Sequence, residues 1–447
     1  MRTRFHFPQF LLPLVVVALL LGTPALNTTV TAAPMNIDDE LAITKQGYDN
    51  IQEYLFKKPD SADILNAGYT AAQKTLASVG PPLDLSGDAN AQWRTFADAV
   101  RALASQSTAN VPSGMLRQRM LNAITMSVGD GHTYYLTKDE YDRERALLVR
   151  GDTSIVNYGF SRVNVGDNVY LRSVVPGSNM DRAGAHPGDQ LLTFDGQPIT
   201  PVNATGLLAM PKEGDTHVFT VQRMGEAMPL TLTVTLERYN VSSLTYRVID
   251  GHIGYIQVSQ FLAETPGKLD DALANLHQQG VDALIVDVRD DPGGLATAES
   301  RFIGRFVPDG TVLGQRVGRD ATTDNIARSE GHAPDDLPLV VLANSNSASA
   351  AEYYTLAMHE LRGAPIVGLT TAGGLGTARS FPLRDGSALS ITISAYTSAK
   401  GAQLNGIGIA PDIMVPNVTS SDLINGRDPQ LDAAIGQANM QVMRPAA

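Results

Sequence analysis

The chain has 447 residues, long enough for about two or three domains, and it contains no cysteine. The missing cysteines exclude disulfides, cysteine-ligated metals and a cysteine nucleophile. Asp and Glu number 46 against 34 Lys and Arg, a net charge of -12 that argues against a nucleic-acid partner. We also expect no cofactor and no metal, since the histidines lack ligand spacing.

The N-terminus has the pattern of a secretory signal. Arg2 and Arg4 precede an apolar segment, Phe10 to Gly22, and small residues follow as far as Ala32-Ala33. The apolar segment is too short for a comfortable membrane span, and an uncleaved anchor is the alternative. We therefore predict a signal peptide over residues 1–33. The mature protein is expected to be secreted, periplasmic or otherwise extracytoplasmic and not to span a membrane.

Residues 36–135 are predicted to form a helical N-terminal region. Apolar residues recur at helical spacing, as at Ile51 and Tyr54, and prolines divide the region into segments. The region ends in a Gly-Asp-Gly-His-Thr turn, in which two glycines flank Asp130 and place His132 on irregular backbone. The turn alone leaves two roles open for His132, a ring bonded to backbone or a ring presented to a cleft.

Residues 150–238 change to short alternating runs separated by Gly and Pro turns, which predicts a small β-rich module. The stretch VVPGSNMDRAGAHPGDQLLTFDGQPI resembles the central segment of a PDZ domain, and Tyr158, Gly159 and Phe160 resemble its carboxylate-binding loop. The resemblance implies that the loop's N–H groups hold the C-terminal carboxylate of a peptide, which adds a strand to the sheet. The alternative is a PDZ fold that packs on its neighbour and binds no peptide.

Residues 240–418 have the pattern of an α/β unit. Strands are predicted at Ile253 to Val258 and at Ala283 to Val288, with a helix between them from Pro266 to Gln279. This order indicates a crossover and therefore a parallel or mixed sheet. Ligand sites in such sheets lie beyond the carboxyl ends of strands, so we expect Gly293-Gly294, which follows the second strand, to face a cleft.

A turn of small residues, Asn344 to Glu352, follows a third apolar strand and precedes a helix. Such a turn can hold a hydroxyl at a sharp bend, beside the N–H groups that a helix N-terminus leaves unpaired. An oxyanion needs such N–H groups, so Ser349 is the leading nucleophile candidate. Helix capping is the ordinary alternative for a serine here. The chain ends in a segment, residues 419–447, with a predicted helix.

Taken in order, these motifs resemble the tail-specific, or carboxyl-terminal processing, serine peptidases. The motifs are Gly129 to Thr133, GYIQVSQF, LIVDVRDDPGG, NSNSASAAE, VGLTTAGGLG and NGIGIAPDI. The resemblance implies a mixed α/β multidomain fold, with a helical region, an embedded PDZ module and a protease core. It also implies a Ser349 nucleophile, with an oxyanion hole made by N–H groups of Gly293 or Gly294 and of Ala350.

The general base departs from the pattern of many members, which place a lysine in a Gly-Lys-Gly loop. Leu375 stands at that position, and Lys400, the only lysine after Ser349, lies in a predicted polar turn. The TTAGG and GDGHT motifs resemble a lysine-free branch related to the tricorn protease core and the interphotoreceptor retinoid-binding protein repeats. In tricorn-like enzymes a histidine supports the serine, so the resemblance assigns His132 as the base.

A third group should orient the histidine. Enzymes of this branch often carry a glutamate just before the closing glycine motif, where this chain has Asn405; Asp130 is the alternative, although it also suits turn capping. The predicted protein is an exported serine endopeptidase acting on polypeptides with free C-termini. Because Leu375 and Asn405 depart from the pattern, the alternative is a weak or inactive relative that binds peptides or small hydrophobic ligands.

Overall fold

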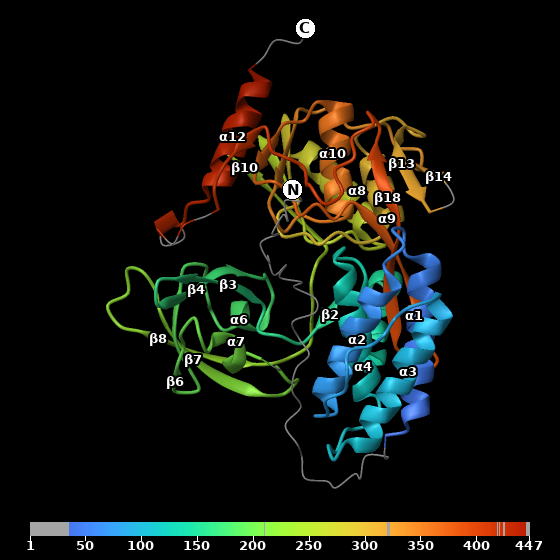
Figure 1. Ribbon diagram of the computed structural model, residues 1–447. Coiled ribbons are helices and arrows are strands. Elements are labelled where there is room, and N and C mark those ends of the chain that lie inside the picture. Colours follow the sequence, from blue (N-terminus) through green and yellow to red (C-terminus); the bar gives the residue numbers. More distant parts are fainter. Residues whose placement is uncertain are drawn as a thin grey trace, which may run out of the picture.

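A computed structural model describes residues 35–209, 211–319, 322–417, 419, 421–422 and 425–443. The predicted signal peptide lies outside the described residues. Within them, no helix is both long and apolar enough to span a membrane. The chain builds a helical region, a β-module and an α/β core, so the predicted mixed α/β class is confirmed (Figure 1).

The N-terminal region consists of α1 (Ile37–Tyr54), α2 (Ser61–Thr75), α3 (Ala89–Gln106) and α4 (Met115–Val128). The first three helices each begin at an Asn or Asp whose side chain accepts an N–H of the first turn. Their apolar faces bury Tyr48, Trp93 and Phe96 in one cluster. Helix α4 ends at Gly129, whose positive φ of 72° lets the chain turn towards His132.

Helix α5 (Lys138–Arg150) links this region to the β-module. The module's strands are β3 (Phe160–Val165), β4 (Asn168–Val174), β5 (Gln190–Phe194), β6 (Gln197–Pro198), β7 (Thr216–Gln222) and β8 (Leu230–Thr235). They pair in the order β3-β4-β5-β7-β8, with β6 on β5, so β3 is an edge strand. Two short helices, α6 (Asn179–Arg182) and α7 (Ala204–Leu207), accompany the sheet, and a ribbon of β2 (Ser154–Ile155) and β9 (Tyr239–Asn240) joins its two ends.

The α/β core is built on a sheet in the order β10-β11-β12-β15-β16-β19. Its strands are β10 (Leu244–Ile249), β11 (Ile253–Val258), β12 (Ala283–Asp287), β15 (Leu339–Ala343), β16 (Ile366–Gly368) and β19 (Ile413–Met414). Strand β10 is antiparallel to β11, and the other pairs are parallel. Helices α8 (Thr265–Gln278), α9 (Ala296–Ile303), α10 (Ala350–Arg362) and α12 (Pro429–Val442) accompany this sheet in the described part of the chain.

Alternate side chains of the central strands enter two different hydrophobic clusters. In β12, Leu284 and Val286 pack with residues of α8, α9 and α10, whereas Ala283 and Ile285 pack with α12. A strand that is covered on both faces must be apolar at every position, which explains its continuous hydrophobic run. The parallel strands all point their carboxyl ends to one edge, where the chain leaves β12 and β15 for the candidate site.

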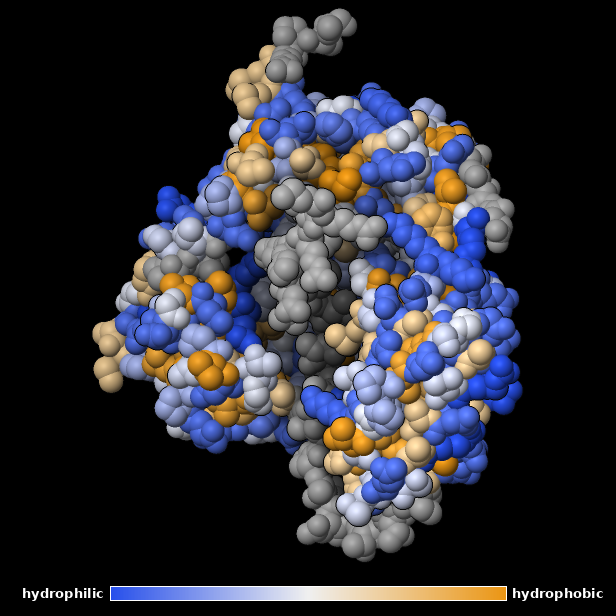
Figure 2. Space-filling model, viewed as in Figure 1, coloured by the Kyte–Doolittle hydropathy of each residue, from blue (hydrophilic) through white to orange (hydrophobic). Residues whose placement is uncertain are grey.

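A second sheet connects the helical region to the core. Its strands are β1 (Tyr134–Leu136), β13 (Val312–Gly318), β14 (Thr322–Ile326), β17 (Gly376–Pro382) and β18 (Ala388–Ser398). The start of β18 pairs with β1 and its end pairs with β13. The long strand β18 therefore holds the segment after His132 against the strands of the core. On the face drawn in Figure 2, hydrophilic side chains are interspersed with apolar ones over all three parts.

Candidate active site

Ser349 occupies a sharp bend between β15 and α10. It is the residue before the first turn of α10, with φ 54° and ψ -119°, and it is only partly buried. A residue other than glycine in this conformation carries about 1–3 kcal/mol of strain, which the surrounding structure must hold. The bend thus places the Ser349 side chain at the N-terminus of a buried helix, as a nucleophile requires.

The glycine pair after β12 lies directly against this bend. A Cβ added at Gly293 would be 2.7 Å from Ser349 Cβ and 2.8 Å from the nitrogen of Ala350, so only glycine fits. The N–H of Gly293 donates to Asp291 Oδ1 over 2.7 Å. In the described part of the chain, the N–H groups of Gly294 and Ala350 have no protein acceptor. Of the three predicted oxyanion donors, these two are free to bind an oxyanion.

His132 is half-buried in the turn between α4 and β1. Burial lowers the pKa of its imidazole below the ordinary value of 6.5, and the charge and a backbone hydrogen bond of Asp130 partly offset this effect. The Asp130 carboxylate accepts the N–H groups of His132 and Thr133 over 3.1 and 2.7 Å and the Thr133 hydroxyl over 2.8 Å. Asp130 therefore caps the turn and shapes the backbone that carries the ring.

Glu352, which the sequence reasoning did not single out as functional, joins the two halves of the site. Its Oε2 accepts the N–H groups of Ser349 over 3.0 Å and Gly374 over 2.7 Å, and its Oε1 accepts the N–H of Gly373 over 2.7 Å and the Thr371 hydroxyl over 2.5 Å. Burial raises the pKa of this fully buried carboxyl, and these hydrogen bonds oppose that shift. Its spacing, three residues after a helix-capping serine, is the signal that could have found it.

The loop bonded to Glu352 also borders His132. A Cβ at Gly374 would lie 2.8 Å from His132 Cε1 and 3.4 Å from Glu352 Oε2. The imidazole and the carboxylate thus meet at Gly374, and the same carboxylate oxygen binds the N–H of Ser349. Glu352 and Gly374 therefore link the Ser349 backbone to the neighbourhood of the His132 ring, although among the described residues no hydrogen bond joins the Ser349 hydroxyl to that ring.

The remaining predicted positions have other surroundings. Leu375 is fully buried in the main hydrophobic cluster of the core, and Lys400 is exposed in a turn. Asn405 is exposed; its Oδ1 would be 3.9 Å from a Cβ at Gly376, and among the described residues no hydrogen bond joins it to His132. In the β-module, Tyr158 is buried, Gly159 has a φ of 84° and Phe160 begins the edge strand β3.

Residues 252–415 match the family model described as Peptidase family S41. The chain therefore contains a peptidase family S41 domain. This result confirms the predicted relationship to carboxyl-terminal processing peptidases at the family level. The S41 domain includes Ser349, the glycine pair and Glu352, whereas His132 belongs to the helical region that precedes it.

Two curated relatives and one solved structure illustrate the similarity. The chain is 30% identical over 274 residues to a carboxyl-terminal-processing protease of Synechocystis, covering 59% of this chain and 64% of that protein. It is 27% identical over 360 residues to a probable CtpA-like serine protease of Staphylococcus haemolyticus, covering 79% and 70%. A putative S41 protease of Bacteroides fragilis superposes with a TM-score of 0.59 at 17% identity, covering 89% of this chain and 97% of that one, which shows the shared fold.

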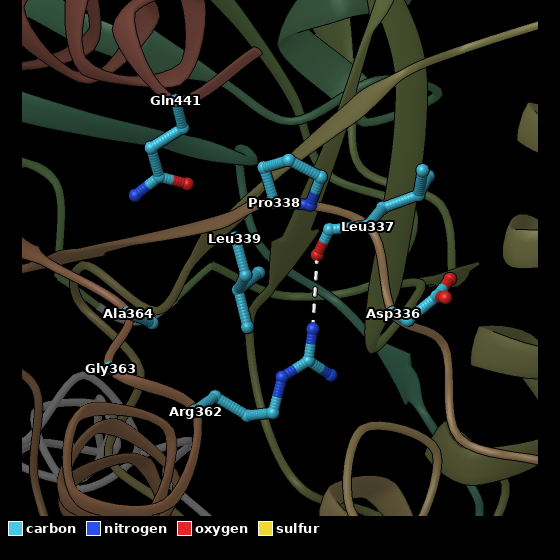
Figure 3. A pocket seen from close by; sticks show the side chains of 8 residues that line it. All are labelled: Asp336, Leu337, Pro338, Leu339, Arg362, Gly363, Ala364 and Gln441. Carbon is cyan, nitrogen blue, oxygen red and sulfur yellow. Dashed lines mark hydrogen bonds between the residues drawn. The ribbon is translucent and has the colours of Figure 1, made fainter. Parts of the chain in front are cut away.

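Two surface cavities lie away from this site. One, of about 330 Å³, is lined by residues at the start of β15 and at the end of α10 (Figure 3). In it, the Arg362 guanidinium donates to the Leu337 carbonyl over 3.1 Å. The other, of about 510 Å³, lies beside α8. Both cavities are lined by Asp336, which precedes β15, so both lie at the opposite end of this strand from Ser349.

Proposed function

We propose that the protein is an exported serine endopeptidase with Ser349 as nucleophile and His132 as general base. The observation that carries the proposal is that one oxygen of Glu352 accepts the N–H groups of both Ser349 and Gly374, the residue that borders the His132 ring, while two unpaired N–H groups lie at the Ser349 bend. The S41 domain and the similarity to proteins named as carboxyl-terminal processing proteases support the same reaction class.

In the proposed reaction, the Ser349 hydroxyl attacks a substrate carbonyl carbon while His132 takes the hydroxyl proton. The carbonyl oxygen becomes an oxyanion, which the N–H groups of Gly294 and Ala350 stabilise. The C–N bond then breaks, His132 returns the proton to the leaving amine, and an acyl-enzyme remains. His132 next activates a water molecule, which releases the acyl group and restores Ser349. Because burial favours the neutral imidazole, His132 is ready to accept a proton at neutral pH.

We further propose that the β-module is a PDZ domain that captures the free C-terminus of the substrate. The loop that precedes the edge strand β3 turns at Gly159, whose carbonyl accepts the N–H of Val175 over 2.8 Å and the Ser178 hydroxyl over 3.2 Å. This anchoring fixes the loop backbone in front of a strand edge that a peptide can extend. Polypeptides with accessible C-termini are therefore the proposed substrates.

The test is cleavage of an unfolded protein with an apolar C-terminus by the chain without residues 1–33. Ser349→Ala and His132→Ala should each lower kcat by about a thousandfold or more. Ser345→Ala, in the same turn but exposed, and His252→Ala, a surface histidine bonded to Asp282, are matched controls that should cleave like the parent. Cleavage by Ser349→Ala at the parental rate would refute the proposal.

A peptide-binding relative without catalysis is the second candidate. The observation that favours it is the exposed position of Asn405, which leaves the His132 ring without a side-chain orienting partner among the described residues. The same experiment separates the two functions. A parent chain that binds the substrate through its C-terminus but never cleaves it would support this second candidate.

A further inference from the structure

Asp291 is a buried carboxyl group in the turn that carries Gly293. Its side chain is completely buried, Oδ1 accepts the N–H of Gly293 over 2.7 Å, and Oδ2 has no partner among the described residues. Its backbone carbonyl accepts the N–H of Ala348 over 3.0 Å, immediately before Ser349. One residue thus fixes both the glycine turn and the segment that leads into the nucleophile.

No cation in the described structure forms an ion pair with Asp291, because the charged groups nearby are engaged elsewhere. Arg289, two residues away, pairs with Asp287 over 2.7 Å and with Asp428 over 2.9 Å. Arg172 pairs with the adjacent Asp290 over 3.4 Å, and Glu352 binds the donors described above. Glu299 on α9, and Tyr353 and Tyr354 on α10, are further buried titratable groups on the helices that follow the two turns.

A buried carboxylate loses its hydration, and without a cation no interaction of similar strength replaces it. The group therefore binds a proton instead. Burial accordingly raises the pKa of Asp291 well above its ordinary value of 3.8, and the only opposing contribution is the hydrogen bond from Gly293. The neutral acid can still accept that N–H at Oδ1. The hydrogen bond sets the orientation of the Gly293 peptide and leaves the N–H of Gly294 free.

We propose that Asp291 is a positioning residue that acts as a neutral acid: it holds the Gly293-Gly294 turn against Ser349, and its ionisation weakens the oxyanion site. The inference rests on the proposed peptidase function. A negative charge at Asp291 would lie one residue from the donor turn and would repel the oxyanion that forms there in a region of low dielectric constant. Cleavage therefore declines as pH rises through the ionisation of Asp291.

The first test does not depend on catalysis. The folded chain keeps the Asp291 proton above the pH at which the unfolded chain releases it, so the parent loses stability as pH rises from about 4 to the folded-state pKa. Asp291→Asn keeps an acceptor oxygen and removes this titration. Urea unfolding gives the folding constant of each chain. The folding constant of Asp291→Asn divided by that of the parent should rise about tenfold per pH unit within this range and be constant above it. A ratio independent of pH would overturn the neutral-acid proposal.

Hydrogen exchange across residues 288–295 tests the positioning contact. The Gly293 amide should exchange slowly in the parent and in Asp291→Asn, and faster in Asp291→Ala, which has no acceptor. Equal protection in all three chains would overturn the positioning role. Both readouts can be taken on a Ser349→Ala background, so they remain decisive if the parent does not cleave peptides and the proposed function itself fails.

The catalytic readout is the pH profile of kcat/KM. The parent should lose activity on the alkaline side, Asp291→Asn should lose this decline, and Asp291→Ala should have a lower kcat at all pH values with little change in KM. A purely structural role for Asp291 would lower the folded fraction without changing the shape of the profile. An alkaline decline of the same midpoint in the Asn variant would therefore refute the proposal.

Discussion

Replacing Glu352 with glutamine tests whether this carboxylate assembles the site. Each of its oxygens accepts two hydrogen bonds, Oε1 from Thr371 and Gly373, and Oε2 from Gly374 and Ser349. Glutamine has one oxygen and one NH₂ group. Two of the four donors would therefore face the NH₂ group, which is itself a donor and cannot accept them. The variant keeps the size of the side chain but cannot satisfy all four bonds.

The magnitude follows from the two orphaned donors. Each buried donor without an acceptor costs about 1–3 kcal/mol, so Glu352→Gln should lower the free energy of unfolding by about 2–6 kcal/mol. Burial already disfavours the charge of Glu352, as its raised pKa indicates, so removing that charge recovers part of the loss and we expect about 3 kcal/mol. This is within the usual stability of a folded protein, so the variant should still fold.

Catalysis should suffer more than folding. The mismatch displaces either the backbone of Ser349 or that of Gly374, which borders His132, and a displacement of about 1 Å can cost a hundredfold in rate. We therefore expect kcat to fall by about a hundredfold with a smaller change in KM, measured at a temperature where urea titration shows the variant folded.

The matched control is Glu360→Gln, on the same helix. Glu360 accepts the Ser398 hydroxyl over 2.6 Å and the N–H of Lys400 over 3.0 Å, away from the site. The hydroxyl can reverse its role and donate to or accept from an amide, so the control should lose about 1 kcal/mol or less and keep the parental kcat. If both variants cleave like the parent, or if both lose the same activity, the assigned role of Glu352 is wrong.

Three further predictions concern the base, the lysine position and the peptide loop. Because burial lowers the pKa of His132, the acid limb of kcat/KM should have its midpoint below pH 6.5, and a midpoint above that value would count against His132 as the base. Leu375→Met should change stability by less than about 1.5 kcal/mol and Leu375→Ala should lower it by about 2–5 kcal/mol, with parental kcat per folded molecule in both; a selective loss of kcat would revive a role for this position. Gly159→Ala should abolish binding of a C-terminal peptide in calorimetry, since the added Cβ would clash with Ser178. The control Gly166→Ala, also at positive φ but in open space, should still bind the peptide, and equal binding by both variants would contradict the proposed loop.

The sequence predicted those elements whose signal is local. The run from Ile253 to Val258 is a strand with the predicted bounds, because every residue in it except the exposed Gln257 is buried and the run is accordingly rich in apolar side chains. Helix α5 was not predicted, because none of its residues is buried and no apolar stripe marks it. Its capping box, Thr137 with Glu140, was the available signal.

In the candidate site, too, features with a local sequence pattern were predicted and features that depend on backbone contacts were not. Ser349 was proposed as the nucleophile from a turn between a strand and a helix, which is a local pattern, and the structure places such a turn between β15 and α10. The contacts of Glu352 and Asp291 were not predicted, since each depends on backbone N–H groups whose orientation no side-chain pattern records. The N–H of Gly293 is the clearest case. From the sequence, Gly293 and Gly294 are equivalent candidate donors, but in the structure the N–H of Gly293 is already bonded to Asp291.

The proposed nucleophile and base come from parts of the chain that fold around different cores. Ser349 follows a strand of the main sheet, whereas His132 follows a helix of the N-terminal region. The segment that carries His132 is held against the core because β1 pairs with β18 and because the Thr133 hydroxyl accepts the N–H of Thr392 on that strand over 3.1 Å. A lysine in the Leu375 loop would have kept both groups within the S41 domain. With leucine there, catalysis by His132 requires the helical region to be docked, so any change that loosens the contact between β1 and β18 removes the base without disturbing the nucleophile.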